Sequence, residues 1–210
     1  GKVRNAAAQA LKSLLCHDRR IVLHLKEALS SETDHFVLAS FILDIGLLGT
    51  DEDRLELVKF LDYEETRIRA NAVEALSGMQ DREKLSAFLI PKLSDSNNRT
   101  RANAAILLFQ IGNLEGLRTL IQMCGDRSSP LMRASGAYGL GEISSQERAR
   151  EIIKNLQSKE MLVDSERLEL METARAELEG LLADSDQMVR RNAARALGRM
   201  GSPNSLPPLV

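Results

Sequence analysis

The stretch "IRANAVEALSGM" at Ile68–Met79 decides the fold, because the chain repeats its opening at a regular distance. The same opening returns as "TRANAA" and as "MRASGA". The arginines of these three copies, Arg69, Arg101 and Arg133, lie 32 residues apart. A fixed period of this length predicts a stack of helical hairpins, since one hairpin is too small to bury its own apolar face.

Two further copies, "VRNAA" at 3–7 and "VRRNAARALGRMG" at 189–201, extend the pattern along the chain. Each repeat reads as a first helix with Leu at helical spacing, a polar turn with an Asp, and a second helix that opens at the Arg. We expect second helices at 3–15, 35–47, 67–79, 99–111, 131–143 and 187–200, and first helices at 20–29, 52–61, 82–93, 114–123 and 146–157. The chain is therefore predicted to be all-α, with about six repeats of ~32 residues.

Two places depart from the pattern. His35 stands where the helix-opening Arg is expected, and the 57 residues from Arg133 to Arg190 are fewer than two full periods. For the irregular segment 144–186 we expect one long helix at about 165–183, formed by two fused repeat helices. The chain starts within a second helix and stops within a first one, so residues 1–210 are expected to be a single solenoid taken from a longer array.

Composition excludes several classes of protein. The net charge is −2, from 28 basic and 30 acidic residues, and this balance disfavours a nucleic-acid binder. The apolar run at 36–48 is interrupted by Ser40 and Asp44 and is too short to span a membrane, so no membrane insertion is expected. Cys16 and Cys124 lie in different repeats, which predicts reduced thiols and a cytoplasmic location.

The repeated stretches resemble the HEAT repeat, particularly the bacterial form first noted in phycobilisome lyase subunits. The resemblance implies a right-handed α-α superhelix, a HEAT-like α-solenoid. It also implies a ladder in which the turn Asp and the helix-opening Arg link neighbouring repeats. The expected ladder residues are Asp62 with Arg69, Asp95 with Arg101, Asp126 with Arg133, and Asp184 with Arg190.

In that family the Arg-led second helices line the concave face, which usually binds partners. Here the outward positions of these helices vary from repeat to repeat while the buried alanines do not. We therefore expect a non-catalytic scaffold that binds a protein or peptide of unknown identity. The expected contact residues on the concave face are Asn71, Glu74, Asn103, Ile106, Gln110, Tyr138, Glu142, Arg191, Arg195 and Arg199.

Several features of this face have two interpretations. The column of asparagines either binds a peptide backbone or bonds neighbouring repeats. Gly136, Gly139 and Gly141 allow either a ligand or a packed helix to come close. The arginines at 191, 195 and 199 either hold acidic side chains or phosphates, or form a solvated face.

Catalysis finds no support in the sequence, and we expect no enzyme, no metal site and no cofactor. His17, His24 and His35 lack the spacing of a metal site or of a catalytic arrangement. Two alternative functions follow from resemblance only. One is a bilin-lyase-like subunit that handles a chromophore, and the other is a nucleic-acid-binding HEAT-like protein.

Overall fold

The computed structural model describes residues 19–157 and 165–201, and side chains within 146–157 are not included in that description. The helix expected at 3–15, together with Cys16 and His17, therefore lies outside the described residues. Contacts between residues group the chain into two units, residues 1–104 and 105–210. The expectation of a single continuous solenoid stays a prediction.

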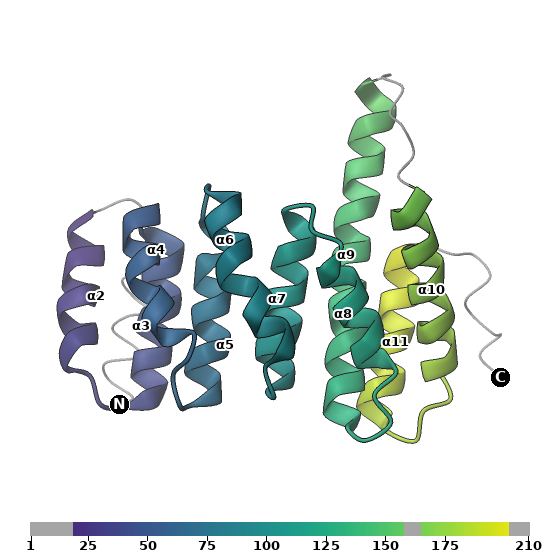
Figure 1. Ribbon diagram of the computed structural model, residues 1–210, viewed down its shortest axis with the longest axis horizontal. Coiled ribbons are helices and arrows are strands. Elements are labelled where there is room, and N and C mark those ends of the chain that lie inside the picture. Colours follow the sequence, from purple (N-terminus) through teal and green to yellow (C-terminus); the bar gives the residue numbers. More distant parts are fainter. Residues whose placement is uncertain (1–18, 158–164, 202–210) are drawn as a thin grey trace. The chain divides into compact units, whose positions relative to one another are not determined.

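The first unit contains alternating first and second helices of the repeat (Figure 1). Its elements are α2 (Arg19–Ser31), α3 (His35–Leu48), α4 (Asp51–Leu57) with η1 (Val58–Phe60), α5 (Thr66–Ala75) with η2 (Leu76–Gly78), α6 (Arg82–Leu89) with η3 (Ile90–Ser94), and the first half of α7 (Asn98–Gln110). Helices α3 and α5 pack directly on each other. The buried side chains between them are mainly aliphatic and small, such as Ile42, Ile45 and Ala72.

The second unit contains the remaining helices that the structure describes (Figure 1). Its elements are the second half of α7, α8 (Glu115–Cys124), α9 (Pro130–Gln157), α10 (Ser165–Leu181) and α11 (Gln187–Met200). Helix α9 packs against both α8 and α11, and α10 packs against α8 and α11. Over the described ranges the chain contains helices and no strand, so the predicted all-α solenoid class is confirmed.

The prediction of separate helices at 131–143 and 146–157 is wrong, because α9 runs through both ranges without a break. The Ser144 hydroxyl donates to the Leu140 carbonyl at 2.6 Å, and the Ser145 hydroxyl to the Gly141 carbonyl at 3.1 Å. These serines bond the preceding turn of their own helix and do not cap a new one. Figure 1 shows the C-terminal part of α9 extending beyond α8 and α11.

The long helix expected at about 165–183 is confirmed as α10. Its place in the packing differs from the expectation of two fused repeat helices, since α10 takes the position of a single first helix beside α11. The 57-residue spacing therefore belongs to one repeat whose second helix is elongated and whose connection is long.

The second helices begin in the same way in both units. Side chains of Asp34, Glu65 and Asp186 accept hydrogen bonds from backbone N–H groups of the first turn, which would otherwise lack partners. In each second helix, the backbone N–H of the fourth residue after the N-cap donates to the N-cap carbonyl. We call this residue the Arg position. It is occupied by Leu38, Arg69, Arg101, Arg133 and Arg190. Thus Leu38, and not His35, occupies the Arg position of α3.

Candidate interaction surface

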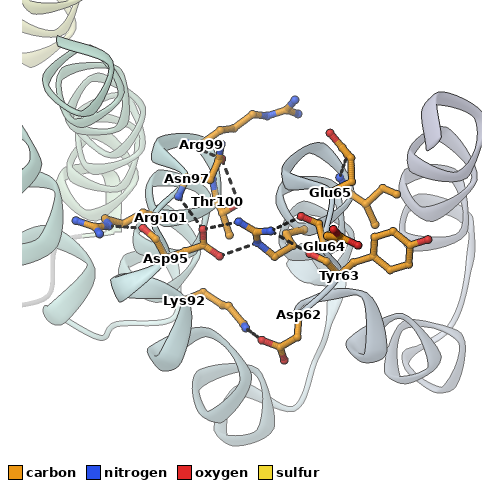
Figure 2. A network of polar contacts seen from close by, with 12 residues as sticks. Asp62, Tyr63, Glu64, Glu65, Lys92, Asp95, Asn97, Arg99, Thr100 and Arg101 are labelled. Carbon is orange, nitrogen blue, oxygen red and sulfur yellow. Dashed lines mark hydrogen bonds and ion pairs between the residues drawn. The ribbon is translucent and has the colours of Figure 1, made fainter. Parts of the chain in front are cut away.

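Arg69 of α5 links one repeat of the first unit to the next. Its Nε donates to Asp95 Oδ2 at 2.9 Å and its Nη2 to Asp95 Oδ1 at 3.0 Å, and its Nη1 donates to the Tyr63 and Glu64 carbonyls. The Asp95 carboxylate also accepts from the Asn97 N–H, and the Asp95 carbonyl accepts from Arg101 (Figure 2). One guanidinium thus holds its own turn and the following turn together.

Arg133 of α9 makes the same contacts in the second unit. Its Nε and Nη2 donate to the two carboxylate oxygens of Asp184 at 2.6 and 3.0 Å, and its Nη1 donates to the Asp126 carbonyl at 2.9 Å. The predicted side-chain pairing within one repeat is therefore wrong for Arg69 and Arg133. Each arginine bonds backbone carbonyls of its own turn and the carboxylate of the next turn, because its side chain points along the stack.

Arg101 and Arg190, the other arginines of the expected ladder, bond backbone carbonyls of their own turns. Arg101 donates to the Asp95 carbonyl at 2.9 Å, and Arg190 donates to the Asp184 carbonyl at 2.6 Å, so both bond the main chain where a carboxylate was expected. The Asp62 carboxylate instead pairs with Lys92 of the following repeat (Figure 2). These contacts make the ladder residues part of the scaffold.

The ladder carboxylates are held in their charged form. Burial acts to raise the pKa of Asp95, but the hydrogen bonds from Arg69 and from the Asn97 N–H outweigh it and lower that pKa below its ordinary value. For Asp184 the hydrogen bonds from Arg133 are the main cause, and they also lower its pKa. Both carboxylates therefore stabilise the fold only while ionised.

The asparagines of the second helices bond neighbouring helices. Asn71 Nδ2 donates to the Ala39 carbonyl at 3.0 Å, Asn103 Nδ2 to the Ala70 carbonyl at 3.3 Å, and Asn192 Nδ2 to the Ala134 carbonyl at 2.9 Å. Of the two interpretations left open by the sequence, this geometry supports the structural one. Asn71 is also buried, which removes it from the expected contact surface.

A stripe of outward positions remains on each second helix. It comprises the residues two before, five after and nine after the Arg position, which the helical period places on one side. We call this stripe the second-helix face. Its members are Phe36, Leu43 and Leu47; Arg67, Glu74 and Gly78; Arg99, Ile106 and Gln110; Leu131, Tyr138 and Glu142; and Met188, Arg195 and Arg199. The outward residues that stand two positions before the Arg were not predicted from the sequence. Their constant distance from the repeated motif is the signal that could have identified them.

In the first unit the charges of this face are paired with neighbours. The Arg67 guanidinium lies 4.1 Å from the centre of the Phe36 ring. The Arg99 Nη2 lies 3.2 Å from Glu74 Oε2, and both side chains are about half exposed. The first unit therefore presents arginines that are already stacked or ion-paired.

In the second unit the face combines apolar and basic side chains. Leu131, Tyr138 and Met188 are exposed, and Arg199 forms an ion pair with Glu142. Arg191 and Arg195 are exposed on α11. Ile106 and Gln110, also expected to contact a partner, are half-buried on α7. The structure thus brings Tyr138, Glu142, Arg195 and Arg199 onto the packed pair α9 and α11.

The three glycines of α9 lie at helix contacts. A Cβ at Gly136 would lie 2.9 Å from the Cys124 nitrogen and from the Leu120 oxygen of α8. A Cβ at Gly141 would lie 3.1 Å from the Ala196 Cα of α11, and one at Gly139 would meet the Leu120 side chain. The packing interpretation of these glycines therefore holds.

The Cys124 thiol of α8 is buried. Burial raises the pKa of the Cys124 thiol to about 12, with a smaller contribution from Glu177. Among the residues that the structure describes, no three His, Cys, Asp or Glu side chains cluster so as to hold a metal ion. Within 19–157 and 165–201, no helix is both long and apolar enough to cross a membrane.

Comparisons with known proteins agree with the repeat architecture. A family model described as HEAT repeats matches residues 160–210, and it confirms the resemblance to HEAT repeats. A crystal structure of an engineered protein from the Northeast Structural Genomics Consortium is 19% identical, with a TM-score of 0.50, over 86% of this chain and 79% of that chain. This similarity shows the fold alone.

A second solved structure, the designed armadillo repeat protein YIII(Dq)4CqI, is 19% identical over 93% of this chain and 92% of that chain, with a TM-score of 0.42. No curated protein matches the chain in sequence.

Proposed function

We propose that this stack of HEAT-type repeats is a non-catalytic scaffold that binds a partner protein or peptide on its second-helix face. One observation carries the proposal. The arginines and asparagines at the repeated positions are used in contacts between repeats, whereas the outward positions carry exposed or half-buried side chains that vary from repeat to repeat. Exposed side chains that do not serve packing are the ones available to recognise a partner.

The proposed contact residues are those predicted from the sequence, without the buried Asn71. They are Glu74, Asn103, Ile106, Gln110, Tyr138, Glu142, Arg191, Arg195 and Arg199. Tyr138, with 51% of its surface exposed, is the proposed anchor, because tyrosine combines a large contact area with a polar tip. A cytoplasmic location remains a prediction from cysteine usage.

Site-specific photo-crosslinking tests this proposal. The photoreactive residue p-benzoylphenylalanine would replace Tyr138 on α9 or, as a matched control, Leu168 on α10, which is exposed to a similar degree. In a lysate of the source cells, we expect a discrete crosslinked partner from position 138 and none from position 168. Equal crosslinking from both positions would contradict the proposed face.

Point variants test the same face without a crosslinker. We expect Tyr138→Ala and Ile106→Asp to reduce retention of the crosslinked partner, with circular dichroism used to check that each variant is folded. Leu168→Ala is the control substitution and should retain the partner fully. If both face variants bind as the parent chain does, the partner contacts another surface.

A further inference from the structure

Helix α11 carries four arginines and no acidic residue. Two of these arginines are used within the fold: Arg190 bonds the Asp184 and Ser185 carbonyls, and Arg199 pairs with Glu142. The other two, Arg191 and Arg195, are exposed, and neither has a hydrogen-bond or ion-pair partner among the described residues. Like charges four residues apart on a helix repel each other, so this pair does not stabilise the helix.

Apolar side chains flank these arginines. Met188 on α11 and Leu131 on α9 both precede the Arg position by two residues, with 47% and 59% of their surfaces exposed. The two helices are bonded side by side, because Asn192 of α11 donates to the Ala134 carbonyl of α9 at 2.9 Å. Leu131 and Met188 therefore occupy equivalent outward positions on two adjacent helices.

The outward arginines of the first unit are already engaged in internal contacts. Arg67 stacks on Phe36, and Arg99 pairs with Glu74. An incoming carboxylate would have to compete with these contacts, whereas Arg191 and Arg195 face no such competitor among the described residues. Among the second-helix arginines whose side chains the structure describes, the two without a partner thus lie on α11.

Building on the proposed function, we propose that the surface of Leu131, Met188, Arg191 and Arg195 binds an acidic segment of a partner protein. Aspartate or glutamate side chains of that segment accept hydrogen bonds from the two guanidinium groups, which can each donate two parallel N–H bonds to a carboxylate. An apolar side chain of the segment covers Leu131 and Met188. A nucleic acid fits less well, because it has no aliphatic side chain to cover Leu131 and Met188 and the chain as a whole has a net charge of −2.

Selection from a random peptide library tests the proposal without knowledge of the natural partner. A displayed library of peptides of about 16 residues would be selected against the full chain and against the double variant Arg191→Glu, Arg195→Glu. The control is Arg82→Glu, Arg127→Glu, which makes the same change in net charge at two exposed arginines outside this surface. Circular dichroism would check that both double variants are folded.

We expect the parent chain and the control to enrich peptides rich in Asp and Glu with at least one aliphatic or aromatic residue. For synthetic copies of these peptides, the double variant on α11 should bind about tenfold more weakly or worse. Raising the salt concentration from about 50 to about 300 mM should weaken binding to the parent chain, because exposed charges are screened.

Other outcomes would overturn the proposal. Enriched peptides without acidic bias whose binding is lost on Tyr138→Ala would support the proposed function and reject an acidic partner. Acidic peptides that bind the α11 double variant as they bind the control would place the site elsewhere. Displacement of the peptides by single-stranded DNA at equal charge concentration would show that the surface binds polyanions in general. If no peptide is enriched, peptide binding by this surface would be rejected.

Discussion

The two units share the contacts that hold repeats together and differ in what they present to solvent. Arg69 with Asp95 in the first unit matches Arg133 with Asp184 in the second, down to the pairing of Nε and Nη2 with the two carboxylate oxygens. On the second-helix face, by contrast, the first unit pairs Arg99 with Glu74, whereas Arg195 of the second unit has no partner among the described residues.

The comparison distinguishes residues that hold the repeats together from residues that face outward. The ladder positions touch the next repeat, so a change there removes contacts from a packed structure. The outward positions are all exposed or half-buried, so their chemistry can change with less effect on stability than at the ladder positions. Function in such a stack therefore has to be read from the positions that the packing leaves free.

Removing one ladder arginine should cause the largest loss of stability. It also tests whether the ladder stabilises the two units to the same extent. Arg133→Met and Arg69→Met should each lower the free energy of unfolding by about 3 kcal/mol, because a nearly buried carboxylate is left without its cation. Urea denaturation measures this change. Arg175→Met, which removes an exposed pair with Glu172, should cost less than about 0.5 kcal/mol. Similar losses in all three variants would mean that the ladder is no more than surface charge.

Two glycine substitutions in the second unit should act with opposite signs. Gly136→Ala in α9 should destabilise by about 1–3 kcal/mol, because the new Cβ would meet backbone atoms of α8. Gly198→Ala in α11 meets nothing within 4 Å and should stabilise by up to about 1 kcal/mol through helix propensity. Thermal denaturation of the two variants checks the signs. A stabilising Gly136→Ala would show that α9 does not pack closely on α8.

Acid should abolish the benefit of the ladder in both units. Because the folded pKa values of Asp95 and Asp184 are lowered, their contribution is complete above the unfolded pKa of about 4 and is lost as the pH falls through the folded values. The difference in unfolding free energy between the parent chain and Arg133→Met should therefore be constant from about pH 7 to 5 and shrink below about pH 4. Urea midpoints across this range measure it. A difference that grows on acidification would contradict a stabilising role of the ionised Asp184 carboxylate.

Breaking the exposed ion pair of the first unit should have only a small effect on stability. Glu74→Gln should change the unfolding free energy by less than about 1 kcal/mol, since both partners are half exposed. It should also free Arg99 and raise the affinity of the first unit for acidic peptides, making it resemble the second. Titration of the selected peptides into Glu74→Gln and into the control Glu83→Gln on α6 would show this. Equal affinities would mean that the Glu74 pair does not mask Arg99.

Much of the fold could be predicted from the repeated motif. The spacing of the arginines placed most second helices to within a few residues, and α10 was expected at nearly its observed position. The break inside α9 was predicted wrongly because the repeat pattern places a turn after each second helix, whereas Ser144 and Ser145 bond the preceding turn and the helix continues. The misplacement of the Arg position at His35 arose because Asp34 sets the start of α3 and only the backbone bond to Leu38 reveals the register.

The candidate site was predictable only in part. The sequence identified Tyr138, Arg191, Arg195 and Arg199 as outward residues, and all four lie exposed. It also proposed Asn71, which is buried and bonds the Ala39 carbonyl. Whether an asparagine amide points to solvent or to the neighbouring helix depends on how closely the two helices approach, and the spacing of one motif does not contain that distance.

The amino-acid sequence by itself determined the period, the helix starts and the all-α class, because helix caps and apolar spacing act over a few neighbouring residues. Tertiary structure decided the partners of the ladder, the role of the asparagines and glycines, and which arginines stay unpaired. Those outcomes depend on contacts between residues such as Arg133 and Asp184, which are distant in the chain and meet only when the helices stack. The same local motif therefore yields a face whose arginines all contact neighbouring side chains in the first unit, and a face in the second unit where Arg199 is ion-paired and Arg195 has no partner among the described residues.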